Sequence, residues 1–168
     1  MIGPDDFRRT LAHFATGVTV VTTWDADARP TGLTASAVTS VSLDPPLILV
    51  CVSQNAHCYP AFKEGGKFAV NVLASDQEAI ARRFASSSLT GEQKFEGVGH
   101  HQGALGLPIV KDALAELECT VVHAYPGGDH TIFVGRVEAV DARGDLGREP
   151  LLYYRGRFDR LHEGGAKS

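Results

Sequence analysis

Hydrophobic and polar residues alternate with a period of two over much of the chain, which is typical of short β-strands. Residues 18–24, rich in Val and Thr, predict a strand, and 25–29 predict the turn after it. Residues 32–43 predict a long β-branched strand that ends at the Asp-Pro-Pro segment 44–46, and 47–53 predict a buried strand. Together these segments predict an antiparallel meander.

The rest of the chain predicts four further strands. Residues 68–73 form the first of them, and 150–161 supply the last. Between them, 114–125 and 130–141 both alternate and are separated by a Pro-Gly-Gly-Asp turn at 126–129. Two alternating runs joined by such a turn predict a β-hairpin.

Helical spacing is confined to a few segments. Residues 5–14 predict a helix that places Phe7, Leu11 and Phe14 on one face and stops at Gly17. A short helix is expected at 58–64, closed by the two glycines that follow it.

Ser75 followed by Glu78 is a capping-box pattern, which predicts the start of a third helix. The apolar face of this helix would carry Ile80, Ala81, Phe84 and Ala85. Residues 86–108, rich in Gly, Ser and His, predict a long loop, and loops of this length are usually functional or mobile.

Many short strands with few, peripheral helices favour a mainly β fold, a closed β-barrel, over a layered α/β fold. The 168 residues fit a single domain over 1–168, with a core at about 7–161 and a frayed tail at 162–168. Because a small barrel is filled by its own side chains, a large planar ligand must sit on the rim or between two subunits. We therefore expect a homodimer.

Charge and cysteine content exclude several classes of protein. A formal net charge of -4, without a cluster of Lys and Arg, argues against nucleic acid as a partner. Three cysteines without a C-x-x-C pair argue against a disulfide framework and a zinc site, and Cys51 and Cys119 lie in apolar runs typical of core residues. Residues 1–9 do not resemble a signal peptide, and the apolar run at 47–52 is far shorter than the about 20 residues that span a bilayer. We expect a cytoplasmic protein without membrane contact.

The common cofactor and nucleophile motifs are absent from the sequence. Without a G-x-G-x-x-G turn after a strand, a nicotinamide nucleotide cannot be bound in the Rossmann manner. Walker, H-E-x-x-H and G-x-S-x-G motifs are missing as well. The adjacent His100 and His101 are a poor metal pair because neighbouring residues seldom point at one ion, so no metal site is expected.

Three polar segments are candidates for a binding site. Small and hydroxyl-bearing residues at 34–37 would let a flat ligand approach the backbone, although a plain strand with a small-residue face fits them too. The polar cluster 53–55 after a strand suits a phosphate or an ordinary turn. In 128–131, His130 follows a carboxylate that can orient its ring, although a solvated turn histidine is equally compatible.

The order of these segments along the chain resembles the short-chain flavin reductases of two-component flavin-dependent monooxygenases, a flavin reductase-like family with an FMN-binding split barrel. The resemblance runs from about residue 7 to 161. It is carried by the blocks 14–23 (FATGVTVVTT), 32–37 (GLTASA), 40–47 (SVSLDPPL), 68–73 (FAVNVL), 128–131 (GDHT) and 150–158 (PLLYYRGRF). Several blocks in one order are far more specific than any single block.

The resemblance implies a Greek-key-like antiparallel split barrel that works as a homodimer, with FMN or FAD at the subunit boundary. The residues that would line the isoalloxazine ring are Thr34, Ala35, Ser36 and Ala37. Those that would reach the ribityl chain and phosphate are Cys51, Val52, Ser53 and Asn55, with Lys94 and Phe95 near the phosphate and ring. The nicotinamide nucleotide would meet His130, Tyr154, Gly156, Arg157 and Phe158.

The activity implied is that of an NAD(P)H:flavin oxidoreductase, with NADH, or NADPH, as hydride donor. His130 would be the catalytic residue, positioning the nicotinamide without acting as an obligatory base. The reduced flavin would diffuse to a separate oxygenase component. Two alternatives are a split-barrel protein that binds flavin or haem without catalysis and an oxidase of an amine-bearing substrate.

Overall fold

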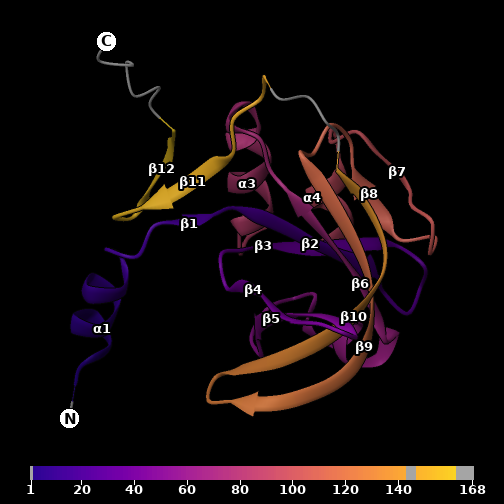
Figure 1. The fold of residues 1–168 in the computed structure, drawn as a ribbon, viewed down its shortest axis with the longest axis horizontal. Coiled ribbons are helices and arrows are strands. Elements are labelled where there is room, and N and C mark those ends of the chain that lie inside the picture. The colour runs from indigo at the N-terminus through magenta and orange to yellow at the C-terminus, as the bar shows by residue number, and fades with distance from the viewer. Residues whose placement is uncertain (1, 143–146, 162–168) are drawn as a thin grey trace.

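The computed structural model describes residues 2–142 and 147–161 (Figure 1). The helices are α1 Pro4–Leu11, α2 Tyr59–Gly65, α3 Glu78–Ala85, α4 Gly91–Phe95 and the 3₁₀ turn η1 Ser75–Gln77. The strands of the first half are β1 Thr16–Gly17, β2 Thr19–Trp24, β3 Pro30–Ala35, β4 Val38–Leu43, β5 Pro46–Ser53 and β6 Lys67–Val72. Those of the second half are β7 His100–Gln102, β8 Pro108–Val110, β9 Ala115–Gly127, β10 His130–Ala142, β11 Leu151–Tyr154 and β12 Arg157–Arg160.

Seven strands form one antiparallel sheet in the order β3-β2-β6-β9-β10-β5-β4. Its two end strands are the two halves of the single long strand predicted at 32–43, which bends at Ser36 and Ala37. The first half of this bent strand, β3, pairs with β2, and its second half, β4, pairs with β5. Because the same bent strand provides both edges, the sheet closes into the expected barrel.

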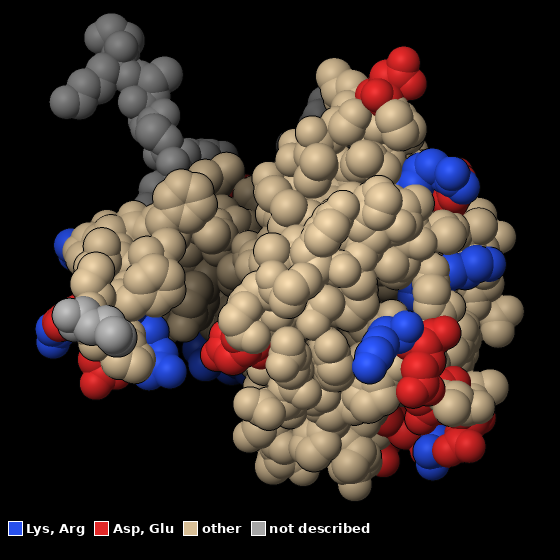
Figure 2. All heavy atoms as spheres, turned by 90° about the horizontal axis from the view of Figure 1, so that it is seen from below, with Lys and Arg blue, Asp and Glu red and all other residues tan. Residues whose placement is uncertain are grey.

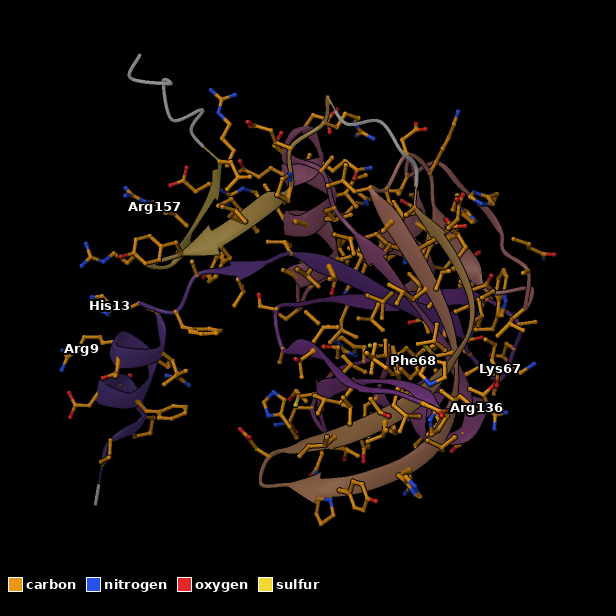
Figure 3. The ribbon with its side chains drawn as sticks, in the orientation of Figure 1. Arg9, His13, Lys67, Phe68, Arg136 and Arg157 are labelled. Carbon is orange, nitrogen blue, oxygen red and sulfur yellow. The ribbon has the colours of Figure 1, made fainter. Side chains whose placement is uncertain are left out.

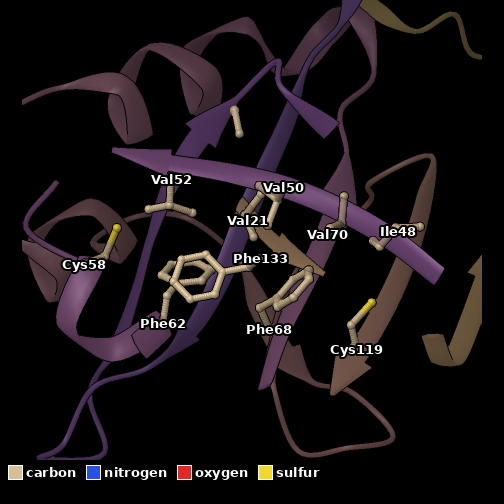
Figure 4. Packing of buried hydrophobic residues seen from close by; sticks show 11 residues of the cluster. Val21, Ile48, Val50, Val52, Cys58, Phe62, Phe68, Val70, Cys119 and Phe133 are labelled. Carbon is tan, nitrogen blue, oxygen red and sulfur yellow. The ribbon is translucent and has the colours of Figure 1, made fainter. Parts of the chain in front are cut away.

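The barrel interior is filled by side chains from every side of the sheet (Figure 4). At its centre Phe62 of α2 lies between Phe68 of β6 and Phe133 of β10, with ring centroids 6.2 and 6.1 Å apart. Each of the three rings is at most 1% exposed. Gly135 is needed beside them, since a Cβ there would lie 2.6 Å from the Phe68 ring. The expectation of a filled interior is confirmed, which leaves the barrel surface for a ligand.

A second layer covers the outer face of β2 and β6, so these strands are buried on both sides. Asn71 of β6 fixes part of this layer: its Nδ2 donates to Val20 O at 2.9 Å, and its Oδ1 accepts from Val110 N at 2.8 Å. Phe84 of α3 and Phe95 of α4 pack edge to face at 4.9 Å in an apolar cluster over the strands.

Three expectations about the elements were wrong. The segment 86–108 is not a plain loop, because it contains α4 and β7 and buries Phe95. The last predicted strand is the hairpin β11–β12, since Arg155 and Gly156 both have positive φ angles and reverse the chain. The third helix is capped one residue early, where the Gln77 side chain accepts from Ala74 N at 3.0 Å.

The hairpin β9–β10 and the strands β2, β5 and β6 lie where the alternation predicts them, whereas β8 was not predicted. The tail predicted at 162–168 lies outside the described residues. Within the described part of the chain, no helix has both the length and the apolar character needed to cross a membrane.

α1 stands apart from the barrel (Figure 1). It connects to the body through β1, which pairs with β11, and through Ala12 O, which accepts from Arg155 N at 2.9 Å. We call α1 with the β11–β12 hairpin the arm. The helix predicted at 5–14 ends at Leu11, so Phe7 and Leu11 share its apolar face whereas Phe14 lies beyond it, and none of the residues of this helix is buried.

Candidate functional site

The outer face of β5 and β10 brings together residues from three of the predicted segments. Cys51 N donates to Ala37 O at 3.0 Å, which sets the bend of the β3–β4 strand beside β5. On the other side of β5, Ser53 lies opposite His130 in the antiparallel ladder. Directly opposed residues share a face of a sheet, and Val50 and Val52 occupy the inner face. Ala37, Cys51, Ser53 and His130 therefore lie on one continuous outer surface, which we call the outer strip.

The outer strip is uncharged apart from its histidine end and is built from small side chains. Ser36 and Ala37 are exposed, and Cys51 and Ser53 are half-buried. Partial burial raises the pKa of the Cys51 thiol, which therefore stays protonated. Ser53 Oγ accepts from Asn55 N at 3.3 Å in the turn that follows β5. A flat ring can approach the backbone here, with hydroxyl and amide groups at one end.

His130 begins β10 directly after a two-residue turn. The turn consists of Gly128, with φ of +73°, and Asp129, and positive φ at the first position alone is typical of a type II′ turn. Asp129 Oδ1 lies 2.7 Å from His130 Nδ1. The hydrogen bond from His130 and the charge of its ring lower the pKa of Asp129. The carboxylate is therefore ionised at neutral pH and accepts a hydrogen bond from the Nδ1–H group of His130.

Gln54 joins this turn to the end of β5. Its backbone N donates to Asp129 O at 3.0 Å, and its side-chain Nε2 lies 3.5 and 3.4 Å from the carbonyl oxygens of Gly128 and His130. The segment 53–55 and the histidine turn are thus held together as one unit.

A serine-rich segment contacts His57, in the stretch that follows β5, although the sequence analysis did not single it out. His57 Nε2 and Ser87 O are 3.2 Å apart, and Ser86 Oγ and Ser88 Oγ are 2.9 Å apart. The signal available in the sequence was the run of three serines at 86–88.

A cleft of about 770 Å³ separates the arm from the barrel. Ser36, Ala37 and Leu49 line its barrel side, and Gly156 lines it from the arm. The apolar residues that complete it are Phe7 and Leu11 of α1 and Phe14 just after this helix, which are 59%, 49% and 71% exposed. Figure 2 shows that the barrel face seen from below is largely uncharged, with most of its charged side chains on the edge away from α1 and an acidic group on the side next to α1.

The comparisons with known proteins agree with this geometry. The model of the flavin reductase like domain matches residues 11–162. The chain belongs to this family.

Relatives in this family carry reductase names. The chain is 37% identical over 157 residues to the reductase subunit of a flavin-dependent monooxygenase from Mycobacterium tuberculosis, covering 94% of this chain and 82% of the relative. It is 42% identical over 166 residues to an NADH-dependent FAD reductase from Streptomyces globisporus, covering 96% and 89%. A solved structure of an NADH:FAD oxidoreductase from Streptomyces globisporus C-1027, in complex with NAD and FAD fragments, has a TM-score of 0.87 and 40% identity, with 98% of each chain covered.

Measured against the flavin site implied by the family, the predicted residues divide into two groups. The outer strip unites Ala37, Cys51, Ser53 and His130, with Ser36 and Asn55 at its margins. Its exposed small residues leave the space that a planar ring system requires, so this surface fits a flavin.

Other predicted residues of the same strands are turned away from this surface. Thr34 Oγ1 donates to Ala81 O at 2.6 Å, and Ala35 is 7% exposed within the core. The Val52 side chain is 0% exposed in the barrel interior. Alternation along β5 places Val52 on the face opposite Cys51 and Ser53, whereas in β3 Thr34 faces α3 and Ala35 faces the barrel interior.

Lys94 and Phe95 also lie elsewhere, between α4 and the strands. Lys94 Nζ donates to Phe84 O at 2.8 Å and contacts Gly32 O at 3.4 Å, and its side chain is buried. Burial lowers the pKa of Lys94 because it disfavours the charged ammonium. The structure gives Lys94 a role in holding α3 to β3 and does not bring it to the outer strip.

The predicted residues of the closing hairpin are spread over the arm. The Arg82 guanidinium lies 4.9 Å above the Phe158 ring, so Phe158 packs against α3. Arg155 covers the Tyr154 ring at 5.4 Å. The side chains of Arg157 and His13 point away from the barrel (Figure 3). Only Gly156 of this predicted set lines the cleft.

Proposed function

We propose that this protein is an NADH-dependent flavin reductase that passes a hydride from NADH to FAD or FMN and supplies the reduced flavin to a separate oxygenase component. The observation that carries the proposal is the outer strip, in which small exposed residues lie beside a carboxylate-bound histidine. Family membership and the names of the relatives support the same activity.

In this proposal the residues of the outer strip position two planar rings. Hydride transfer from nicotinamide C4 to flavin N5 requires the reacting atoms at roughly 3–3.5 Å. Ser36, Ala37 and Cys51 receive the flavin ring, and their small size admits the nicotinamide above it. Ser53 and Asn55 contact the ribityl and phosphate groups, with 86–88 beside them. His130 positions the nicotinamide.

The working form in this proposal is a homodimer. The apolar residues of α1 lie across a cleft from the barrel, and a second subunit would cover them. The largely uncharged barrel face beside α1 favours the same arrangement, because interface cores are poor in charged residues. A flavin on the outer strip would then lie next to the partner subunit, where it can still leave.

The test of the activity is direct. The purified protein with FAD and NADH, followed at the 340 nm absorbance of NADH under air, should oxidise NADH continuously, and omitting flavin should abolish the rate. Parallel series with FMN, riboflavin and NADPH rank the substrates. Loss of absorbance that does not depend on added flavin, or flavin binding without NADH oxidation, would refute the reductase. The second result would favour a non-catalytic flavin-binding protein.

Supply of reduced flavin by diffusion has its own test. The reductase and a flavin-dependent oxygenase, placed on opposite sides of a dialysis membrane, should still yield oxygenated product, at lower efficiency than when mixed. Product formation only on mixing would show that a complex is required. In this proposal the protein works in the cytoplasm, where NADH is available to it.

A further inference from the structure

We propose that Asp129 is a positioning residue that acts through His130: its carboxylate fixes the ring so that Nε2 faces the carboxamide of the nicotinamide. This inference rests on the proposed function and extends it to a residue that does not itself contact the substrate.

The contact between Asp129 and His130 allows only one tautomer of the neutral imidazole ring. Asp129 Oδ1 lies 2.7 Å from Nδ1, and an ionised carboxylate can only accept hydrogen bonds. Nδ1 must therefore carry a proton. When the ring is neutral, Nε2 holds its lone pair and can accept a hydrogen bond from the N–H of a carboxamide.

The turn leaves the other ring nitrogen available. The His130 side chain is 42% exposed, and no residue in the described part of the chain hydrogen-bonds to its Nε2. Its neighbour across the ladder is Ser53, on the outer strip. A ring held at Nδ1 and open at Nε2 is placed to meet a ligand on that strip.

The surroundings keep the carboxylate in place. Gln54 N donates to Asp129 O, so the backbone of the turn is fastened to β5. The titratable and charged groups that face Asp129 are His130 on its own hairpin and, more weakly, Arg8 of α1, which also pairs with Asp5 at 3.3 Å. The strongest contact of the carboxylate is with His130, because their hydrogen bond is the largest cause of its lowered pKa.

The test is the substitution Asp129→Asn, which keeps the size of the side chain and is tolerated in turns. An Asn can present its N–H₂ to Nδ1, which allows the proton to move to Nε2 and removes the acceptor. We expect the KM for NADH to rise about three- to tenfold, corresponding to one hydrogen bond, while the Kd for FAD stays unchanged. Asp27→Asn, in the exposed turn after β2, is the matched control and should leave both constants unchanged.

A second readout is independent of turnover. Nitrogen-15 NMR at about pH 8.5, roughly two units above the ordinary imidazole pKa, should show His130 of the wild type protonated at Nδ1. In D129N the proton should be shared with Nε2, and H130Q identifies the resonances. An unchanged tautomer together with an unchanged KM would overturn the role of Asp129, and so would loss of FAD binding. If the wild type itself fails to oxidise NADH, the proposed function fails, whereas the NMR result still decides the role of the carboxylate.

Discussion

β6 and α1 both carry large apolar side chains, but these end in opposite environments. In β6, Phe68 is 0% and Val70 is 1% exposed, because the barrel interior receives them. In α1, Phe7 and Leu11 lie on one predicted face but remain 59% and 49% exposed. A hydrophobic period shows which face of an element requires burial. It does not show whether the same chain or another molecule covers that face.

The packed interior of the barrel and its outer surface contribute to different properties, the first to stability and the second to function. The filled side of the barrel holds the packed phenylalanines, whereas the outer strip and the cleft hold small residues, a histidine turn and uncovered apolar side chains. We expect substitutions on the filled side to change the free energy of unfolding. Substitutions in the outer strip and the cleft should instead change the binding of flavin and NADH and the association of two subunits.

The largest effect should follow from Phe68→Ala, which removes a ring from the centre of the barrel. The cavity and lost burial should cost about 3–5 kcal/mol of unfolding free energy, measured by urea denaturation. Thr10→Ala on the exposed helix α1 should change it by less than about 0.5 kcal/mol. Similar values for the two variants would contradict the contrast between the regions.

Leu11→Ala tests whether a second subunit covers α1. Leu11 is half-exposed in one chain, so completing its burial in both subunits should stabilise a dimer by about 2–3 kcal/mol. The substitution should raise the dimer dissociation constant roughly 30- to 150-fold, measured by sedimentation at several concentrations. Thr10→Ala is again the control. A monomeric wild type would remove the homodimer from the proposal.

Lys94→Met tests a charge that lies on the filled side. Two carbonyl groups would lose their ammonium partner, which should destabilise the protein by about 1–3 kcal/mol. Because the folded-state pKa of Lys94 is lowered, the wild type should gain stability as pH rises through that value toward the usual 10.5. This gain should disappear in K94M and persist in the exposed control Lys111→Met. If the unfolding free energies of all three proteins change with pH in the same way, the gain in stability does not come from Lys94.

His130→Ala should act on catalysis rather than on folding. We expect the KM for NADH to rise or kcat to fall by about three- to tenfold, with FAD binding intact, because a hydrogen bond to the nicotinamide is lost. Steady-state kinetics and flavin titration measure the two effects, and His101→Ala on β7 is the control. Loss of FAD binding without a change in the response to NADH would contradict the positioning role.

The smallest effect is expected at Asp25, in the exposed turn after β2. The backbone N–H of Arg29, followed by that of Asp27, lowers the pKa of Asp25. Its contribution is therefore present above the usual 3.8 and is lost as pH falls through the lowered value. Asp25→Ala should cost less than about 1 kcal/mol at neutral pH, and the difference from wild type should vanish in acid. A difference that persists at low pH would mean that the carboxylate is not its cause.

Much of the site could be predicted because order along the chain carries family information. The segments that contain Ala37, Ser53 and His130 were identified from their sequence, and the ladder places them side by side. Thr34 and Lys94 were expected beside the flavin but hydrogen-bond within the protein, because a motif does not reveal which way each side chain faces. The helix α4 was missed since a five-residue helix carries too little periodicity to detect.

The sequence alone determined the β-rich class, the tight turn before His130 and the apolar face of α1, because these depend on local spacing and backbone preference. Only the tertiary structure decided that 32–43 bends to close the barrel, that Lys94 is buried and that Asp129 and Gln54 secure the histidine turn. These features depend on contacts between residues far apart in the chain, or on the directions of individual side chains, and periodicity specifies neither.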